Sequence, residues 1–114
     1  MRLRKRSEFL RAARGRKFVA KPVVLQSVER RGVPGSSPEN EIGVGFTATR
    51  RLGNAVERNR AKRRMREAAR LVMPSLAEPG NDFVLIARGP ILTCSFDQII
   101  HSLEEGLRRL RRSR

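Results

Sequence analysis

The sequence predicts an α/β fold in which helices pack against a β-sheet. Segments whose apolar residues repeat at helical spacing alternate with segments rich in β-branched residues, in the order α, β, β, β, α, β, α. The length of 114 residues suits one compact domain spanning 1–114, and a hydrophobic content of 39% is sufficient for a core. These observations set the fold class before any motif is considered.

The N-terminal part predicts a helix followed by strands. Ser7 can cap a helix that has Glu8 in its opening turn and stops at Gly15. Strands are expected on both sides of Pro22, because β-branched residues dominate there. Residues 30–40 contain two Pro, two Gly and two Ser, a composition typical of a mobile hairpin loop.

The middle of the chain predicts a two-faced strand and a long helix. Segment 42–49 alternates strictly between apolar residues and small or polar residues. The small face leaves room for another element to lie against the sheet. A helix begins at Asn54, where Glu57 completes a capping-box pattern, and it runs to about Met73, before Pro74.

The C-terminal part predicts a turn, a strand and a helix. The turn covers 78–81, and the continuous apolar run 83–87 is typical of a central strand covered on both sides. Ser95 and Gln98 form a second capping pattern. The helix that follows has helically spaced apolar residues and ends in an arginine cluster at 108–112.

Positive charge gathers in three segments. The chain has 26 Lys and Arg against 11 Asp and Glu, a formal net charge of +15. Residues 1–21 hold nine basic and one acidic side chain, residues 50–70 nine and two, and residues 108–114 five and none. This pattern favours a polyanionic partner. Nucleic acid is favoured over a membrane, because a membrane-surface helix would carry a broad apolar face with bulky aromatic residues.

Several classes of protein are excluded or disfavoured. No apolar run approaches the ~18–20 residues of a membrane span, and the charged N-terminus lacks the apolar stretch of a secretory signal, so we expect a soluble, cytoplasmic protein. Cys94, the single cysteine, excludes an intrachain disulfide and a cysteine-based zinc site and is expected to be a buried thiol. A protein nuclease would need a metal-binding carboxylate cluster or a histidine pair. The acidic residues show no metal spacing, and His101 is the single histidine.

Segment 51–67 is the most informative stretch. A glycine turn leads into a helix with one narrow apolar face and cations around the remainder. Like charges four residues apart, such as Lys62 and Arg66, each destabilise an isolated helix by a few tenths of a kcal/mol. An RNA backbone would compensate for this repulsion, because guanidinium groups form paired hydrogen bonds with phosphate oxygens. Asn59 can bond a 2′-hydroxyl or a base edge. The apolar face comprises Ala61, Met65, Ala68 and Val72.

The string RLGNAVERNRAKRRMRE at 51–67, with Gly43–Thr47 before it and Asp82–Arg88 after it, resembles the protein subunit of bacterial ribonuclease P. The resemblance runs from about Leu3 to Leu110. It implies a two-layer α/β sandwich of order αβββαβα with an unusual left-handed βαβ crossover, like the second domain of a small-subunit ribosomal protein. It further implies a ribonucleoprotein whose RNA, with Mg²⁺, removes the 5′ leader from precursor tRNA by endonucleolytic cleavage. The chain alone would be non-catalytic and would bind no cofactor.

The same resemblance implies two RNA-binding sites. The residues facing the catalytic RNA would be Arg58, Asn59, Arg60, Lys62, Arg63 and Arg66. The precursor tRNA leader would lie in a cleft between the first helix and the sheet, with candidates Phe9, Lys17, Phe18, Phe46, Arg50, Arg51 and Arg88. Members often carry a second aromatic one turn after Phe9, where this chain has Ala13. Phe46 shares its strand face with Ile42 and Val44, which favours a core position for its ring.

Two other function classes stay open. A structural ribosomal or RNA-chaperone protein, with no role in tRNA processing, would show similar electrostatics, and a self-sufficient metal nuclease is the weakest alternative. Neither a membrane nor a protein partner is expected.

Overall fold

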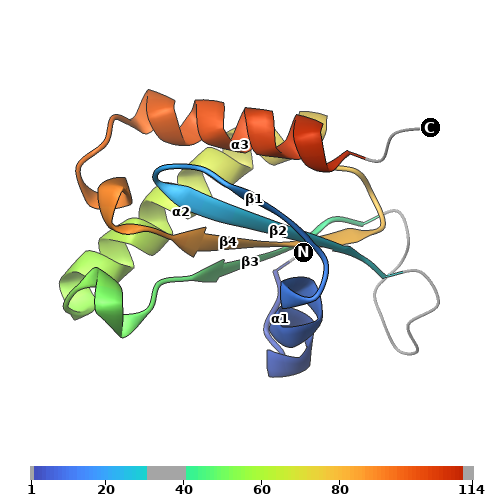
Figure 1. Ribbon diagram of the computed structural model, residues 1–114, viewed down its shortest axis with the longest axis horizontal. Helices are drawn as coiled ribbons and strands as arrows, with labels where there is room; N and C mark the ends of the chain where they lie inside the picture. Colours follow the sequence, from blue (N-terminus) through green and yellow to red (C-terminus); the bar gives the residue numbers. More distant parts are fainter. Residues whose placement is uncertain (1, 31–40, 112–114) are drawn as a thin grey trace.

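The computed structural model describes residues 2–30 and 41–111. Over these residues the elements are α1 (Arg6–Ala13), β1 (Arg16–Val19), β2 (Val23–Glu29), β3 (Gly43–Thr47), the 3₁₀ turn η1 (Arg50–Leu52), α2 (Ala55–Leu76), β4 (Asn81–Ala87), the 3₁₀ turn η2 (Gly89–Leu92) and α3 (Phe96–Leu110). The predicted order αβββαβα is confirmed. The helices α2 and α3 form a second layer against one face of the sheet, and α1 lies on the opposite side (Figure 1).

The described strands form one sheet in the order β1-β2-β4-β3. β2 is antiparallel to both β1 and β4, whereas β3 and β4 are parallel and are connected through α2. The left-handed sense of this crossover stays a prediction. β4 lies between β2 and β3, so the predicted hairpin connection over 30–40 is wrong, because the strands that it joins are not neighbours. The mobility expected of that loop concerns 31–40, which lie outside the described residues.

The two faces of the sheet are covered differently. Leu25 and Leu85 belong to the face that is buried against α2 and α3. On the other face, Val84 packs with Leu3 and Ala12 in a smaller cluster. Because α1 has only eight residues, it covers one part of this second face.

The predicted apolar face of α2 is confirmed. Ala61, Met65 and Ala68 have no exposed surface, and Val72 is 5% exposed. The predicted capping box is also present, since Asn54 Oδ1 accepts from the Glu57 amide at 2.9 Å and the Glu57 carboxylate accepts from the Asn54 amide at 3.0 Å.

The predicted end of α2 at Met73 is wrong. The helix continues through Pro74 to Leu76, and the Ala77 amide donates to the Met73 carbonyl at 2.9 Å. Pro74 lies in the last turn, so only one helical hydrogen bond is lost there. The packing of Met73, which is 3% exposed, holds this turn against the sheet layer.

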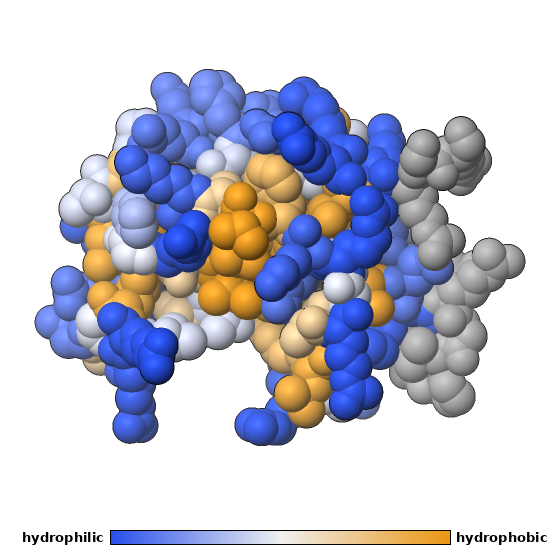
Figure 2. Space-filling model, in the orientation of Figure 1, coloured by the Kyte–Doolittle hydropathy of each residue, from blue (hydrophilic) through white to orange (hydrophobic). Residues whose placement is uncertain are grey.

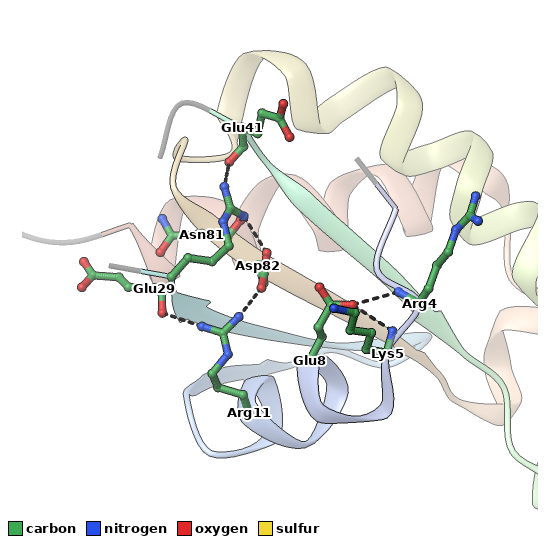
Figure 3. A network of polar contacts seen from close by, with 9 residues as sticks. Arg4, Lys5, Glu8, Arg11, Glu29, Glu41, Asn81 and Asp82 are labelled. Atoms are coloured by element: carbon green, nitrogen blue, oxygen red, sulfur yellow. Dashed lines mark hydrogen bonds and ion pairs between the residues drawn. The ribbon is translucent and has the colours of Figure 1, made fainter. Parts of the chain in front are cut away.

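The predicted capping role of Ser7 is wrong, because α1 begins at Arg6 with Lys5 as its N-cap. The Glu8 carboxylate instead accepts hydrogen bonds from the backbone amides of Lys5 (2.8 Å) and Arg4 (3.1 Å) (Figure 3). The pKa of Glu8 is lowered. Burial, the largest single influence, raises it, but these two backbone hydrogen bonds and the charges of Lys5 and Arg11 together outweigh burial.

A buried charge network ties α1 to the ends of β2 and β4 (Figure 3). Asp82 has no exposed surface, and its carboxylate contacts the guanidinium of Arg11 at 2.5 Å and that of Arg30 at 2.6 Å. Further guanidinium N–H groups of the two arginines donate to the carbonyl oxygens of Glu29, Asn81 and Glu41. This network fixes the position of α1 relative to the sheet.

Candidate nucleic-acid interface

The outer surface of α2 carries cations that no acidic group balances. The six residues predicted to face the catalytic RNA are all exposed or half-buried: Arg58, Asn59, Arg60, Lys62, Arg63 and Arg66. Within the part of the chain that the structure describes, none of their side chains takes part in an ion pair. Arg58, Lys62 and Arg66 are four residues apart, so they form one row along the helix.

Two other arginines of α2 are held by the protein itself. The guanidinium of Arg64 donates to the carbonyl oxygens of Ile91 at 2.6 Å and Cys94 at 2.7 Å, so it fixes η2 against α2. Arg70 pairs with Glu67 on the surface. Their side-chain hydrogen bond lowers the pKa of Glu67 and raises the pKa of Arg70. The charge available to a ligand is therefore carried by the other cations of the helix.

The sheet face beside α1 is open at one edge. Strand register places Val19, Val24, Ile86 and Thr47 side by side, one from each strand, and we call this row the open stripe. Val19 is 53% exposed, and the other three are half-buried. Figure 2 shows apolar surface over the strands near the middle of the view, with hydrophilic side chains around it.

The next row of the sheet lies beneath α1, beside the open stripe. It runs from Lys17 through Gln26 and Val84 to Gly45. A Cβ atom on Gly45 would lie 2.7 Å from two ring atoms of Phe9, so only glycine lets this ring rest on β3. The prediction that the small face of this strand leaves room for another element is confirmed, and that element is α1.

Cations line the sheet edge at which the open stripe lies. Arg88 directly follows β4, and its guanidinium donates to the Ala20 carbonyl at 2.8 Å, in the turn between β1 and β2. Arg50 and Arg51 follow β3 and are exposed. Because β3 and β4 are parallel, their carboxyl ends lie at the same edge. The stripe therefore has basic groups at its rim and an aromatic ring at its side.

Known proteins resemble this chain in sequence and in fold. A family model described as Ribonuclease P matches residues 1–111. The ribonuclease P protein component of Ruegeria pomeroyi is 49% identical over 110 residues, which cover 95% of this chain and 84% of that protein. The chain belongs to the ribonuclease P protein family.

Solved structures of ribonuclease P proteins share the fold. The protein from Staphylococcus aureus superposes with a TM-score of 0.74 at 28% identity, covering 95% of this chain and 93% of that one. The protein from Thermotoga maritima also gives 0.74, at 24% identity, with 96% of each chain covered. The mixed α/β class expected from the sequence is therefore confirmed for this family member.

The structure separates the seven predicted leader residues into two groups. Phe9 and Lys17 lie on the open side of the sheet, and Arg50, Arg51 and Arg88 lie at its edge. Phe9, Lys17 and Arg88 therefore lie beside the open stripe, whereas Arg50 and Arg51 follow the carboxyl end of β3 in η1. The other two, Phe18 and Phe46, are placed on the opposite face.

Phe18 and Phe46 pack beneath the helix layer. Phe18 pairs with Leu25, and Phe46 pairs with Leu85, so both rings point toward the buried face. The ring centroid of Phe18 also lies 5.9 Å from the guanidinium carbon of Arg109, on α3. The core position that alternation predicts for Phe46 is confirmed, and neither ring lies beside Phe9.

The open stripe was missed by sequence reasoning, which considered aromatic and basic side chains alone. Val24 and Ile86 lie in segments expected to form strands, and residue alternation does assign them to a face. Which four side chains meet, however, depends on strand order and register. No local pattern in the sequence contains that information.

The described residues offer no metal site. Over 2–30 and 41–111, no group of three or more His, Cys, Asp and Glu side chains could hold a metal ion. The carboxylate of Asp82 is engaged with the guanidinium groups of Arg11 and Arg30. His101 is exposed on α3. Cys94 is half-buried, so the prediction of a buried thiol is wrong.

None of the helices in the described ranges is long and apolar enough to cross a bilayer.

Proposed function

We propose that this chain is the RNA-binding subunit of a cytoplasmic ribonuclease P, an endoribonuclease. It binds the catalytic RNA and the 5′ leader of precursor tRNA, and it assists the cleavage that produces the mature tRNA 5′ end. The observation that supports this proposal best is the presence of two separate surfaces: the unbalanced cations of α2, and the open stripe beside α1.

The α2 surface suits a structured RNA. Guanidinium groups form paired hydrogen bonds with phosphate oxygens, and each neutralised phosphate releases counterions. The row of Arg58, Lys62 and Arg66 offers repeated charge along one line, and Asn59 adds a donor and an acceptor for a 2′-hydroxyl or a base edge. Because these like charges repel one another within the helix, RNA binding also reduces the electrostatic repulsion that destabilises α2 in the free protein.

The open stripe suits a single strand. Neighbouring strands of a sheet lie about 4.8 Å apart, so four side chains in a row extend over about 14 Å. Unpaired bases can rest on this apolar surface and stack on the Phe9 ring, a contribution of roughly 1–3 kcal/mol per base on an aromatic side chain. Lys17 and Arg88 border it, and Arg50 and Arg51 follow β3 at the same end of the sheet, where phosphates of the leader would lie. Phe18 and Phe46 support the sheet from the other face.

In this proposal the RNA carries out the chemistry, and the side chains of this chain bind and orient. Arg58 and its neighbours hold the catalytic RNA, while Phe9, Lys17 and the rim arginines hold the leader in a fixed register beside it. Such positioning lowers the entropic part of the barrier to cleavage.

Reconstitution tests the proposal. Precursor tRNA is cleaved by the matching catalytic RNA at low Mg²⁺ concentration, with and without the protein. We expect the protein to accelerate cleavage and to raise the affinity for precursor over mature tRNA. Unchanged cleavage and affinity would contradict the proposal and favour a structural RNA-binding protein, and cleavage by the protein alone would show that the RNA does not carry the chemistry.

A further inference from the structure

A groove of about 670 Å³ lies between β3 and α2, away from the open stripe. Its floor is apolar: Val44 and Phe46 of β3 form one side, and Ala69 and Met73 of α2 form the other. β3 is the edge strand of the sheet, so the groove opens to the outside of the molecule. This volume is within the range of small-ligand sites. We call it the edge groove.

Cations dominate the rim of the edge groove. Arg2, Arg66 and Arg70 line it together with Glu41. Across 2–30 and 41–111, neither Arg2 nor Arg66 has an ion-pair partner, and Arg70 shares its charge with Glu67. The rim therefore attracts a ligand that combines negative charge with a flat apolar part.

The N-terminal segment fixes one cation in place. Arg2 forms a parallel bridge with Val44, and the Leu3 amide donates to the Val44 carbonyl at 2.9 Å. The backbone of Arg2 therefore runs along the outer edge of β3, and its side chain belongs to the groove lining. Because its backbone is already held, Arg2 loses little conformational entropy when a ligand binds in the groove.

The edge groove continues the cationic row of α2. Arg66 is the last member of the row that starts with Arg58 and Lys62, and it is also a rim residue of the groove. A phosphate backbone that follows the row reaches the groove at Arg66. A second copy of this chain would bring its own unbalanced arginines to this rim, so charge disfavours self-association there.

We propose that the edge groove holds an unpaired base of the catalytic RNA, with the phosphates on either side of that base at Arg66 and Arg2. This inference rests on the proposed function and adds a base-binding site to the phosphate contacts of α2. A nucleotide matches the groove because its base has apolar faces and its phosphate is negative. The base anchors the RNA in register along α2, which phosphate contacts alone leave free to slide.

The test compares two matched substitutions in the full chain, bound to the matching catalytic RNA. Val44→Gln places an amide in the apolar floor of the groove. Leu71→Gln makes the same kind of change at a residue of α2 that is 53% exposed and does not line the groove. Base accessibility of the RNA is probed with dimethyl sulfate for A and C and with a carbodiimide reagent for U and G, and backbone protection is probed with hydroxyl radicals.

We expect at least one unpaired base to be protected by the unsubstituted chain and by Leu71→Gln, and to be exposed with Val44→Gln. Affinity for the RNA should fall about fivefold or more with Val44→Gln, because a buried amide in the floor disfavours burial of the apolar face of a base. Backbone protection at the α2 contacts should persist. Equal base protection in all three proteins would overturn the inference, as would RNA binding without any protected unpaired base.

A second pair of variants guards against a folding defect. Val44→Leu keeps the floor apolar and should retain base protection, whereas Arg2→Ala, at an exposed side chain, should weaken protection and lower the salt dependence of binding by about 0.7 in log-log slope. Unchanged protection and slope with Arg2→Ala would contradict the placement of phosphate at this rim.

If the unsubstituted chain does not bind the catalytic RNA at all, the proposed function itself fails, and that outcome is distinct from binding without base protection.

Discussion

The carboxylate of Asp82 contacts the guanidinium of Arg30 at 2.6 Å, and both side chains are almost completely buried. Arg11 of α1 approaches the same carboxylate from the other side of the network. A buried carboxylate is thus shared by two guanidinium groups that come from distant parts of the chain. The arrangement pins α1 against the sheet, and α1 carries the Phe9 ring that borders the open stripe.

Replacing Asp82 with Asn should lower the free energy of unfolding by roughly 3–5 kcal/mol, because two guanidinium groups lose their shared buried counter-charge. Urea unfolding followed by circular dichroism measures this change. Glu67→Gln is the matched control, since it removes one carboxylate from an exposed pair and should leave stability almost unchanged. Equal effects of the two substitutions would show that the Asp82 network does not stabilise the fold.

The double substitution of Arg58 and Arg60 with Ala should weaken binding of the catalytic RNA. It should also flatten the salt dependence of binding by on the order of 0.7–0.9 in log-log slope per lost phosphate contact. Titration of the RNA at several salt concentrations measures both quantities. An unchanged slope would mean that these arginines do not contact phosphate.

Arg64→Ala should lower the stability of the protein without changing the salt dependence of RNA binding, because this guanidinium is bonded to the Ile91 and Cys94 carbonyls. We expect a loss of about 1–3 kcal/mol in the free energy of unfolding, since those carbonyls lose their donors, and an unchanged salt slope for RNA binding. Chemical denaturation and salt titration of the same protein sample test both parts. A reduced slope with intact stability would place Arg64 on the RNA instead.

Phe9→Ala should lower the affinity for leader-containing precursor tRNA by up to roughly 1–3 kcal/mol, the contribution of one stacked base. The affinity for mature tRNA, which has no leader, should not change. Phe9→Leu is the informative companion, since it fills part of the space over Gly45 without an aromatic face. We expect both variants to lose leader affinity, and the Ala variant to lose more stability. Equal losses for precursor and mature tRNA would indicate a folding defect rather than a lost leader contact.

Glu8 should make the stability of α1 depend on pH in acid. Its pKa in the folded chain lies below the ordinary value of 4.5, although burial alone would raise it, because the Lys5 and Arg4 amides bond the charged form. A lowered folded pKa means that the stabilisation is present above 4.5 and is lost as the pH falls through the folded value. The stability difference between the wild-type chain and Glu8→Gln, measured by urea unfolding, should therefore shrink as the pH decreases. A difference that is constant with pH would exclude this role for Glu8.

Much of the fold follows from local patterns. The capping box at Asn54 and Glu57, the buried face of α2 and the central position of β4 were all predicted, because each depends on residues that are close in sequence. The errors at Ser7 and Pro74 have the same origin. Each residue is a common terminus signal, and in each case stronger neighbouring interactions shift the helix end by one to three residues.

The family, the α/β class and the cationic character of α2 were determined by the sequence itself, since motif, periodicity and charge need no knowledge of the fold. Only the tertiary structure decided which side chains meet. It placed Phe18 and Phe46 on the buried face, joined four strands into the open stripe, and gave Arg64 and Asp82 partners that are 27 or more residues away. Burial, strand register and charge pairing are properties of contacts between distant segments, and such contacts exist only after the chain has folded.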